Sequence, residues 1–279
     1  MAAVPAPLVF IAAGLSTYMG AGFAVSLFAL MPSTTVAWWR VTIGAVVLLL
    51  WRRPWRRAWT RRELVLSAAF GVAMATMNVL FYASIDYLPL GTAVSVEFLG
   101  PVIVALSTGR GWQPRAAAAL ALAGVASISG LGLDLTNPTH RLGMLLALAA
   151  GGAWAGYILL GRRVASRGTG IDSLALAAVA GCLAYLPLAA PTMLRALTST
   201  ATILAVVGVA VLSTVVPYAL DQVNMRRLGP DSFSLLASLM PATSLLVGVV
   251  MLRQLPSAGE VTGLVLISVA VALAGRSGR

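Results

Sequence analysis

Long apolar runs fill most of the 279-residue sequence, and short connectors with glycine, proline or arginine separate them. A bilayer whose hydrocarbon core is about 30 Å thick needs about 20 apolar residues for each helix that crosses it. Division at the turn and charge signals predicts ten such helices, over residues 7–29, 33–51, 63–85, 90–108, 115–133, 142–161, 172–190, 200–224, 231–251 and 257–275. The pattern therefore predicts an all-α, multi-pass membrane protein with ten transmembrane helices.

The arginines in the connectors predict the orientation, because cytoplasmic loops carry an excess of basic residues. With the N-terminus inside, fifteen arginines lie on the cytoplasmic side, namely Arg52, Arg53, Arg56, Arg57, Arg61, Arg62, Arg110, Arg115, Arg162, Arg163, Arg167, Arg226, Arg227, Arg276 and Arg279. The outer connectors hold three, Arg141, Arg195 and Arg253. The opposite orientation would reverse this ratio, so we expect an N-in and C-in topology.

Two segments of the chain are similar at a constant offset of 140 residues, and the matched pairs are Leu88 with Leu228, Thr92 with Ser232, and Pro101 with Pro241. Each half holds five predicted spans, an odd number, so the second copy must be inverted relative to the first. We therefore expect one five-helix repeat over residues 1–138 and another over residues 139–279. Inverted repeats in secondary transporters place a substrate site at the repeat interface and alternate access to it.

Composition and charge support a membrane protein and exclude a nucleic-acid-binding one. Hydrophobic residues make up 59% of the chain and charged residues 10%, with a mean hydropathy of +0.94. That composition leaves too little polar surface for a soluble domain of this length. All 19 basic side chains behind the net charge of +11 are arginines. They cluster between apolar runs, which is typical of topology signals and not of a surface for nucleic acid.

The residue types that carry chemistry are too few for an enzyme. The sequence has no lysine, which a Walker A phosphate loop requires. Cys182 stands alone in an apolar run, and His140 stands alone in a polar connector. Neither a metal centre nor a nucleophilic catalytic set can be assembled from them. We therefore expect no enzymatic activity and no cofactor.

Arg40, Glu97 and Asp221 are ionisable residues inside apolar runs, where a charge facing lipid would cost several kcal/mol. Arg40 and Glu97 lie at similar depth from the outer face, so a structural ion pair between the second and fourth spans is one interpretation. The other is that Glu97 binds a substrate ammonium group or a coupling proton, and that Arg40 binds a carboxylate. Asp221 lies near the cytoplasmic end of its span, where it either reaches water or joins the site.

Pro101 and Pro241 occupy matching positions in the two repeats. A helical residue 101 would normally donate its N–H to the carbonyl of Glu97, and proline has no N–H to donate. Pro241 frees the carbonyl of Ala237 in the same way. We expect both prolines to kink their helices next to a central polar site and to serve its opening and closing; a kink without a binding role is the alternative.

Aromatic and amide side chains could line a site between these charges. The candidates are Asn78 and Tyr82, which lie four residues apart in the third span, Tyr218 beside Asp221 in the eighth span, and Tyr18, Trp154 and Tyr157. Each ring offers an apolar body, and tyrosine and tryptophan add a polar tip. We include all of them in the predicted substrate site, with packing as the alternative for each aromatic residue.

Several motifs together resemble the EamA family of the drug/metabolite transporter superfamily, and within it the bacterial threonine/homoserine exporter group. They are Met77-Asn78, Leu80-Phe81-Tyr82, Leu88-Pro-Leu-Gly, Val96-Glu97-Phe98, Gly100-Pro101, Trp154, Tyr157-Ile158-Leu159, Ser213-Thr214 and Pro217-Tyr218. The resemblance spans most of the chain, and the Glu97 segment is its most specific part. It implies efflux of threonine, homoserine and similar small amino acids from the bacterial inner membrane. Asp221 departs from the pattern, because it stands where the group leads us to expect a glutamate.

The sequence thus predicts a secondary exporter of small amino acids that works by alternating access between its two halves. The expected partners are the amino acid or metabolite and the lipid bilayer, with proton coupling as an option. An exporter of drugs or other small metabolites is the alternative. Gly259 and Gly263 form a GxxxG pattern in the last span, and such surfaces pack closely either within a monomer or between monomers, so a monomer and a homodimer both remain open.

Overall fold

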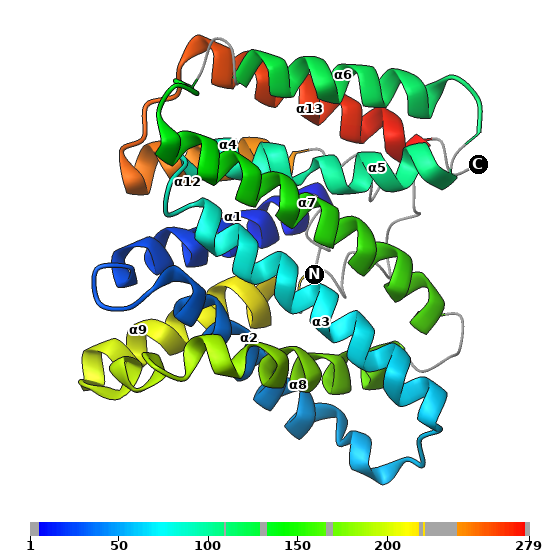
Figure 1. Cartoon of the computed structure of the whole chain (residues 1–279), viewed down its shortest axis with the longest axis vertical. Coiled ribbons are helices and arrows are strands. Elements are labelled where there is room, and N and C mark those ends of the chain that lie inside the picture. The colour runs from blue at the N-terminus through cyan, green and yellow to red at the C-terminus, as the bar shows by residue number, and fades with distance from the viewer. Residues whose placement is uncertain are drawn as a thin grey trace, which may run out of the picture.

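The computed structural model describes residues 6–108, 110–128, 133–165, 170–217, 220 and 239–276. Its helices are α1 (Ala6–Leu27), α2 (Ser33–Arg52), η1 (Pro54–Arg56), α3 (Arg61–Ser84), α4 (Leu90–Glu97), α5 (Leu99–Thr108), α6 (Gln113–Ser127), α7 (Pro138–Ala165), α8 (Gly170–Ala189), η3 (Met193–Leu197), α9 (Thr200–Ala210), η4 (Val211–Val215), α12 (Met240–Leu252) and α13 (Ala258–Arg276) (Figure 1). No strand occurs in the described ranges. The prediction of an all-α protein is confirmed.

Six helices in the described part of the chain are long and apolar enough to cross a membrane, over Leu8–Leu27, Ser33–Arg56, Arg61–Ser84, Leu90–Ser107, Pro138–Val164 and Asp172–Ala189. Shorter apolar helices cover Thr200–Val215, Met240–Leu252 and Ala258–Leu273. These stretches coincide with predicted spans, although the total of ten spans stays a prediction. The fourth predicted span is interrupted at Phe98, three residues before Pro101, the residue at which the sequence predicts a kink, and it is divided there into α4 and α5.

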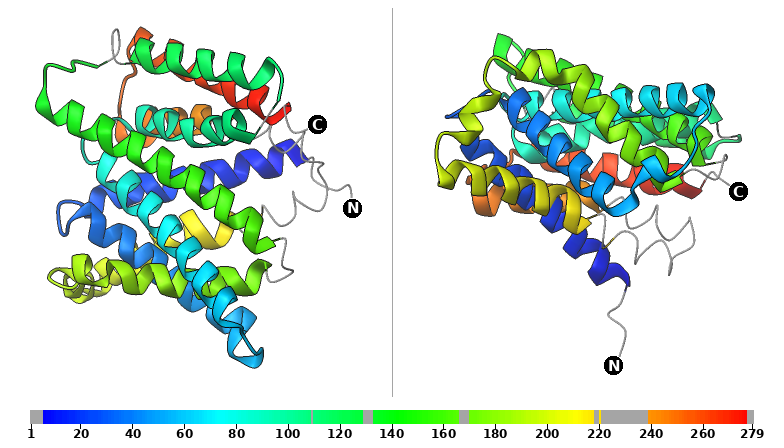
Figure 2. Two further views of the ribbon diagram at one scale, coloured as in Figure 1. Left: turned by 45° about the vertical axis from the view of Figure 1, so that its right-hand side comes forward. Right: turned by 90° about the horizontal axis from the view of Figure 1, so that it is seen from below.

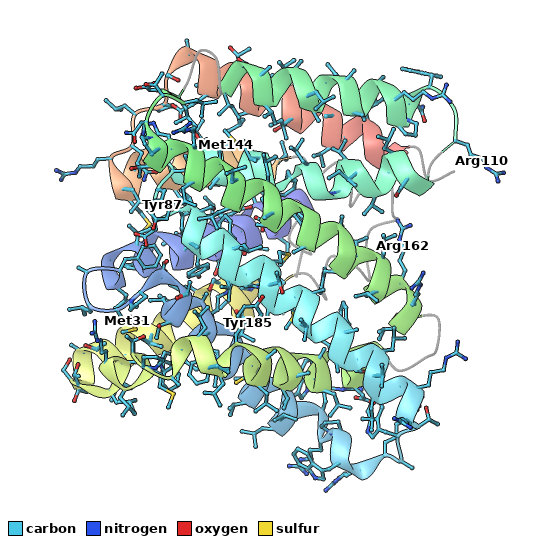
Figure 3. The ribbon with its side chains drawn as sticks, viewed as in Figure 1. Met31, Tyr87, Arg110, Met144, Arg162 and Tyr185 are labelled. Atoms are coloured by element: carbon cyan, nitrogen blue, oxygen red, sulfur yellow. The ribbon has the colours of Figure 1, made fainter. Side chains whose placement is uncertain are left out.

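Residues close to helix ends in the described part of the chain lie toward two ends of the helix bundle. Met31, Tyr87 and Met144 lie toward one end, and Arg110 and Arg162 lie toward the other (Figure 3). The first turn of α1 and the last turn of α13 point toward the same side of the molecule in the left view of Figure 2. Arg110 and Arg162, the two arginines labelled in Figure 3, thus lie at the same end of the bundle. The sequence predicts that this end faces the cytoplasm, and that orientation stays a prediction.

Glycines bring α3 and α8 together at their backbones. A Cβ atom built at Gly71 would lie 1.8 Å from the carbonyl oxygen of Ala177, and one at Gly181 would lie 2.7 Å from the carbonyl oxygen of Gly71. Any larger side chain at these positions would collide with main-chain atoms that belong to the opposite helix. Such close approach between small residues provides the van der Waals contact that holds helices together in lipid.

The same principle joins α6 and α13, which lie side by side in Figures 1 and 2. A Cβ atom at Gly124 would lie 2.8 Å from the carbonyl oxygen of Gly263, and the hydroxyl of Ser127 donates to the carbonyl of Gly259 at 3.0 Å. The predicted GxxxG surface is therefore packed against α6 within the chain. The oligomeric state stays open.

Glu260, in the first turn of α13, is a buried carboxylate that the sequence pattern did not single out. It accepts a hydrogen bond of 2.5 Å from the hydroxyl of Thr92 in α4. The side-chain carbonyl of Gln254 accepts from the backbone N–H of Leu90 at 2.9 Å and so caps α4, because its N-cap residue, Pro89, makes no side-chain cap. The start of α4 is thus tied to the α12–α13 segment.

We expect Gly71→Ala to lower the melting temperature in detergent, because the added methyl group must push α3 away from the backbone of Ala177; overpacking of this kind costs about 1–3 kcal/mol. Gly152→Ala is the matched control, since nothing lies within 4 Å of a Cβ atom built there. The control should stay within about 0.5 kcal/mol of the wild type. Equal melting temperatures for the two variants would contradict the close approach of α3 and α8.

Candidate functional site

Arg40 lies in α2 and is partly buried against the second half of the chain. Its Nη2 donates to the backbone carbonyl of Ser213 at 2.8 Å, and its Nε donates to the hydroxyl of Thr214 at 3.2 Å. The guanidinium carbon also lies 5.5 Å from the centre of the Tyr82 ring, within the range of a cation–π interaction. The charge of Arg40 is therefore satisfied inside the protein and does not face lipid.

The acceptors for this guanidinium belong to η4, a π-helical turn that continues α9. A π-turn departs from the regular i→i+4 hydrogen-bond pattern, and such turns are frequent at functional sites. Ser16 of α1 donates its hydroxyl to the carbonyl of Leu212 at 2.7 Å. Gly20 of α1 lies so close to η4 that a Cβ atom there would come within 2.7 Å of the Ser213 side chain. α1 and α2 thus both hold the π-turn.

Glu97 is the last residue of α4, and 9% of its surface is exposed. The helix is interrupted at Phe98, and α5 begins at Leu99 with Pro101 in its first turn. Residue 101 has no N–H with which to bind the carbonyl of Glu97. α7 packs directly on this break, since a Cβ atom at Gly151 would lie 2.9 Å from that carbonyl oxygen. The carboxylate therefore lies where the main chain changes course.

Arg40 interacts electrostatically with Glu97 and with Tyr18 of α1, which is 5% exposed. Arg40 and Glu97 do not form a direct ion pair, because no N–O distance between them falls within 4.0 Å and the guanidinium is directed at Ser213 and Thr214. No hydrogen bond reaches the Glu97 carboxylate from the residues that the structure describes. The direct ion pair between Arg40 and Glu97, which their similar depth in the sequence suggested, is therefore not formed. The two charges interact at a longer distance.

Tyr82 and Asn78 lie one turn apart on α3, and both are buried. The Tyr82 ring is fully buried and meets Phe28 and Phe81 edge to face, with centroid distances of 6.3 Å and 5.9 Å. Asn78 donates its side-chain N–H to the carbonyl of Met74 at 2.8 Å, within its own helix. The phenol is thus held by rings, while the amide is partly satisfied by its own backbone.

Trp154 and Tyr157, both on α7, have different surroundings. Trp154 meets Phe98 edge to face at 4.7 Å, which places it beside the helix break that follows Glu97. Tyr157 stacks on Phe70 of α3 at 4.7 Å and packs with the cluster of buried apolar residues around that ring. Trp154 therefore lies next to the charged site, and the ring of Tyr157 contributes to packing between α3 and α7.

The remaining predicted site residues belong to the second half. Pro241 is the second residue of α12, so it occupies the first turn of a helix where a missing N–H is tolerated. Tyr218 and Asp221 lie outside the described residues, and so does Ala237.

The sequence motifs include Ser213-Thr214, but they did not predict that these two residues accept hydrogen bonds from Arg40. The carbonyl of Ser213 becomes an acceptor because of a π-turn, and no residue pattern in the sequence predicts such a turn. The hydroxyl groups of Ser16 and Thr214 carried a weaker signal, because polar residues in apolar spans commonly form hydrogen bonds between helices.

The assembled site combines a guanidinium, a nearby carboxylate and buried phenol rings between helices of both halves. Opposite charges that are close but not directly paired can bind the two ends of a small zwitterion. No group of three histidine, cysteine, aspartate or glutamate side chains that could hold a metal ion occurs within the described ranges.

Comparisons with known proteins match most of the chain. The model of the EamA-like transporter family matches residues 141–276. The threonine/homoserine exporter RhtA of Escherichia coli (strain K12) is 33% identical over 249 residues, which cover 89% of this chain and 84% of that protein. The threonine/homoserine exporter RhtA of Salmonella typhimurium (strain SL1344) is 32% identical over 271 residues, which cover 97% of this chain and 90% of that protein.

Solved structures share the fold, and one crystal structure illustrates the match. It superimposes with a TM-score of 0.59 at 24% sequence identity, and the match covers 96% of both chains. At this identity the likeness concerns the arrangement of the helices alone.

We expect Arg40→Gln to lower the melting temperature, because it leaves the Ser213 carbonyl without its donor and Glu97 without its nearest described counter-charge. The double variant Arg40→Gln/Glu97→Gln should recover part of the loss, with a coupling of about 1 kcal/mol in a double-mutant cycle. Arg195→Gln is the control, since Arg195 is exposed in η3. Its effect on the free energy of unfolding should add to that of Glu97→Gln without coupling. Additivity for both pairs would show that Arg40 and Glu97 do not interact.

Proposed function

Because the chain belongs to the EamA-like transporter family, we propose that it is a secondary transporter that exports small amino acids of the threonine and homoserine type across the bacterial inner membrane. The substrate class is supported by relatives named as threonine/homoserine exporters, which are 32–33% identical over most of the chain. A zwitterionic amino acid carries one positive and one negative group. It needs a site that offers the opposite charge to each.

The buried Glu97 carboxylate, near Arg40 but not paired with it, is the observation that carries the proposal. A carboxylate inside a membrane-spanning segment is costly unless function retains it. Glu97 binds the substrate ammonium group. The two N–H groups of Arg40 that hold Ser213 and Thr214 are engaged. The remaining N–H groups of the guanidinium bind the substrate carboxylate, because a planar guanidinium carries five N–H donors in all.

Tyr82, Asn78 and Tyr18 line this site from α3 and α1, and Trp154 closes it beside the helix break. Tyr218 and Asp221 complete the proposed set from the second half. Pro101 and Pro241 allow the fourth and ninth spans to bend as the halves move. Tyr157 joins the set through α7, although its ring packs on Phe70.

Two inverted five-helix repeats, residues 1–138 and 139–279 with both termini inside the cell, provide the alternating access in this proposal. If each helix of the first half is matched to the helix at the same position in the second half, the helix contacts within the structure fall into equivalent sets. α3 packs on α7 and α8, and α9 packs on α1 and α2. α4 packs on α7, and α12 packs on α1. The family match over residues 141–276 falls within the second proposed repeat. Rocking of one half against the other moves the site from inside to outside.

We expect Glu97→Gln to reduce counterflow of labelled threonine and homoserine in proteoliposomes by tenfold or more, because glutamine keeps the shape but cannot neutralise an ammonium group. A tenfold loss corresponds to about 1.4 kcal/mol of binding or transition-state free energy. Asp86→Asn is the control, since Asp86 is exposed in the connector after α3. This variant should transport both amino acids at the wild-type rate.

Unchanged threonine and homoserine transport in Glu97→Gln would overturn the role of the carboxylate. A wild type that carries neither amino acid but carries ethidium or methyl viologen would favour the drug-exporter alternative. A flux that does not saturate and shows no counterflow would favour a passive channel.

Proton coupling follows from the same carboxylate, because a buried group that binds an ammonium ion in one state can bind a proton in another. We expect an imposed proton gradient to drive threonine against its concentration gradient in proteoliposomes. A protonophore should then return the distribution to equilibrium. Exchange of labelled for unlabelled threonine should survive the protonophore. Uphill transport that persists after the proton gradient has collapsed would exclude this coupling.

A further inference from the structure

The hydroxyl of Tyr82 is a polar group without a partner in the part of the chain that the structure describes. The side chain is 0% exposed, and its oxygen makes no hydrogen bond to any described residue. A buried hydroxyl without a partner destabilises the folded protein, because it has given up its hydrogen bonds to water and gained none in return. Its retention at a fully buried position therefore calls for a function.

Two serine hydroxyls share this condition, Ser67 in α3 and Ser268 in α13, but their chemistry differs. A serine hydroxyl rotates about one bond and can reach the carbonyl one helical turn earlier. The phenol oxygen lies at the far end of a rigid ring, and Phe28 and Phe81 hold that ring edge to face. Tyr82 cannot turn its hydroxyl back to its own helix, so its partner must come from elsewhere.

The surroundings of Tyr82 connect this hydroxyl to the charged site. The Arg40 guanidinium lies 5.5 Å from the centre of the Tyr82 ring, and the same guanidinium interacts electrostatically with Glu97. A small amino acid bound between those two charges therefore lies beside the Tyr82 ring. The part of a threonine or homoserine molecule that is not ammonium or carboxylate is a short chain that carries one hydroxyl group, on the β-carbon in threonine and at the end of the chain in homoserine.

We propose that the hydroxyl of Tyr82 hydrogen-bonds the side-chain hydroxyl of the substrate and so selects hydroxy amino acids over alkyl amino acids of the same shape; this inference rests on the exporter function proposed above. The full burial of Tyr82 makes the selection effective. In a site shielded from water, an alkyl substrate leaves the phenol unpaired, and water cannot compensate for the missing bond.

The test compares substrates that differ by one group. Threonine and valine have the same shape, with a hydroxyl in one where the other has a methyl group, and homoserine and norvaline form a second pair. Initial counterflow rates of the four labelled amino acids are measured in proteoliposomes for the wild type and for Tyr82→Phe. We expect Tyr82→Phe to lower both the threonine-to-valine and the homoserine-to-norvaline ratio about tenfold. The rates for valine and norvaline should stay equal or rise.

Tyr185→Phe is the matched control. The Tyr185 hydroxyl already has a partner, Thr76, at 2.7 Å between α8 and α3. Its removal should lower the melting temperature and leave both substrate ratios unchanged. Tyr82→Phe should leave the melting temperature unchanged and lower both substrate ratios, because it removes a hydroxyl that has no partner among the described residues.

Three outcomes overturn the inference in distinguishable ways. If the wild type carries neither threonine nor homoserine, the exporter function fails and the role of Tyr82 fails with it. If the wild type carries them and Tyr82→Phe keeps both ratios, only the recognition of the hydroxyl fails, as it would if the phenol simply bound an ordered water. If Tyr82→Phe slows all four amino acids equally, Tyr82 shapes the site and does not read the substrate.

Discussion

Arg40 brings a positive charge into the apolar interior of the helix bundle, and the central packing follows from the need to satisfy it with hydrogen-bond acceptors. Its partners are a backbone carbonyl and a hydroxyl in the π-turn η4. That turn is itself held by Ser16 and Gly20 of α1. Since α1 and α2 belong to the first half of the chain and η4 to the second, one side chain joins the two halves through hydrogen bonds that lipid could not replace.

The Glu97 carboxylate makes no direct ion pair with Arg40, because the Arg40 guanidinium donates its hydrogen bonds to Ser213 and Thr214. A direct ion pair would have neutralised both groups and tied α2 to α4. Instead, the carboxylate lies at the interruption between α4 and α5, near a positive charge and without a hydrogen bond from the described residues. A separated pair of this kind suits a ligand that carries both charges, whereas a closed pair would have to be broken before a ligand could bind.

The two halves contribute different chemistry to the site. The first half supplies the charged groups, Arg40 and Glu97, and the phenols of Tyr18 and Tyr82. The described part of the second half supplies η4, with its backbone acceptor, and Trp154 beside the helix break. Away from the site, α3 with α8 and α6 with α13 meet through glycine backbones. Close-packed backbones there provide the van der Waals contact that holds these helix pairs together in lipid.

The sequence by itself determined the all-helical class, most helix positions, and Arg40 and Glu97 as unusual charges. These features depend on local hydrophobicity and on the cost of a charge in lipid, which act on short segments. Only the tertiary structure decided which groups those charges meet. The direction of Arg40 toward Ser213, the hydrogen bond of Glu260 to Thr92, and the unpartnered hydroxyl of Tyr82 all depend on distances between segments far apart in the chain. Residue spacing along one helix carries no information about such distances, because they are set by how the helices pack.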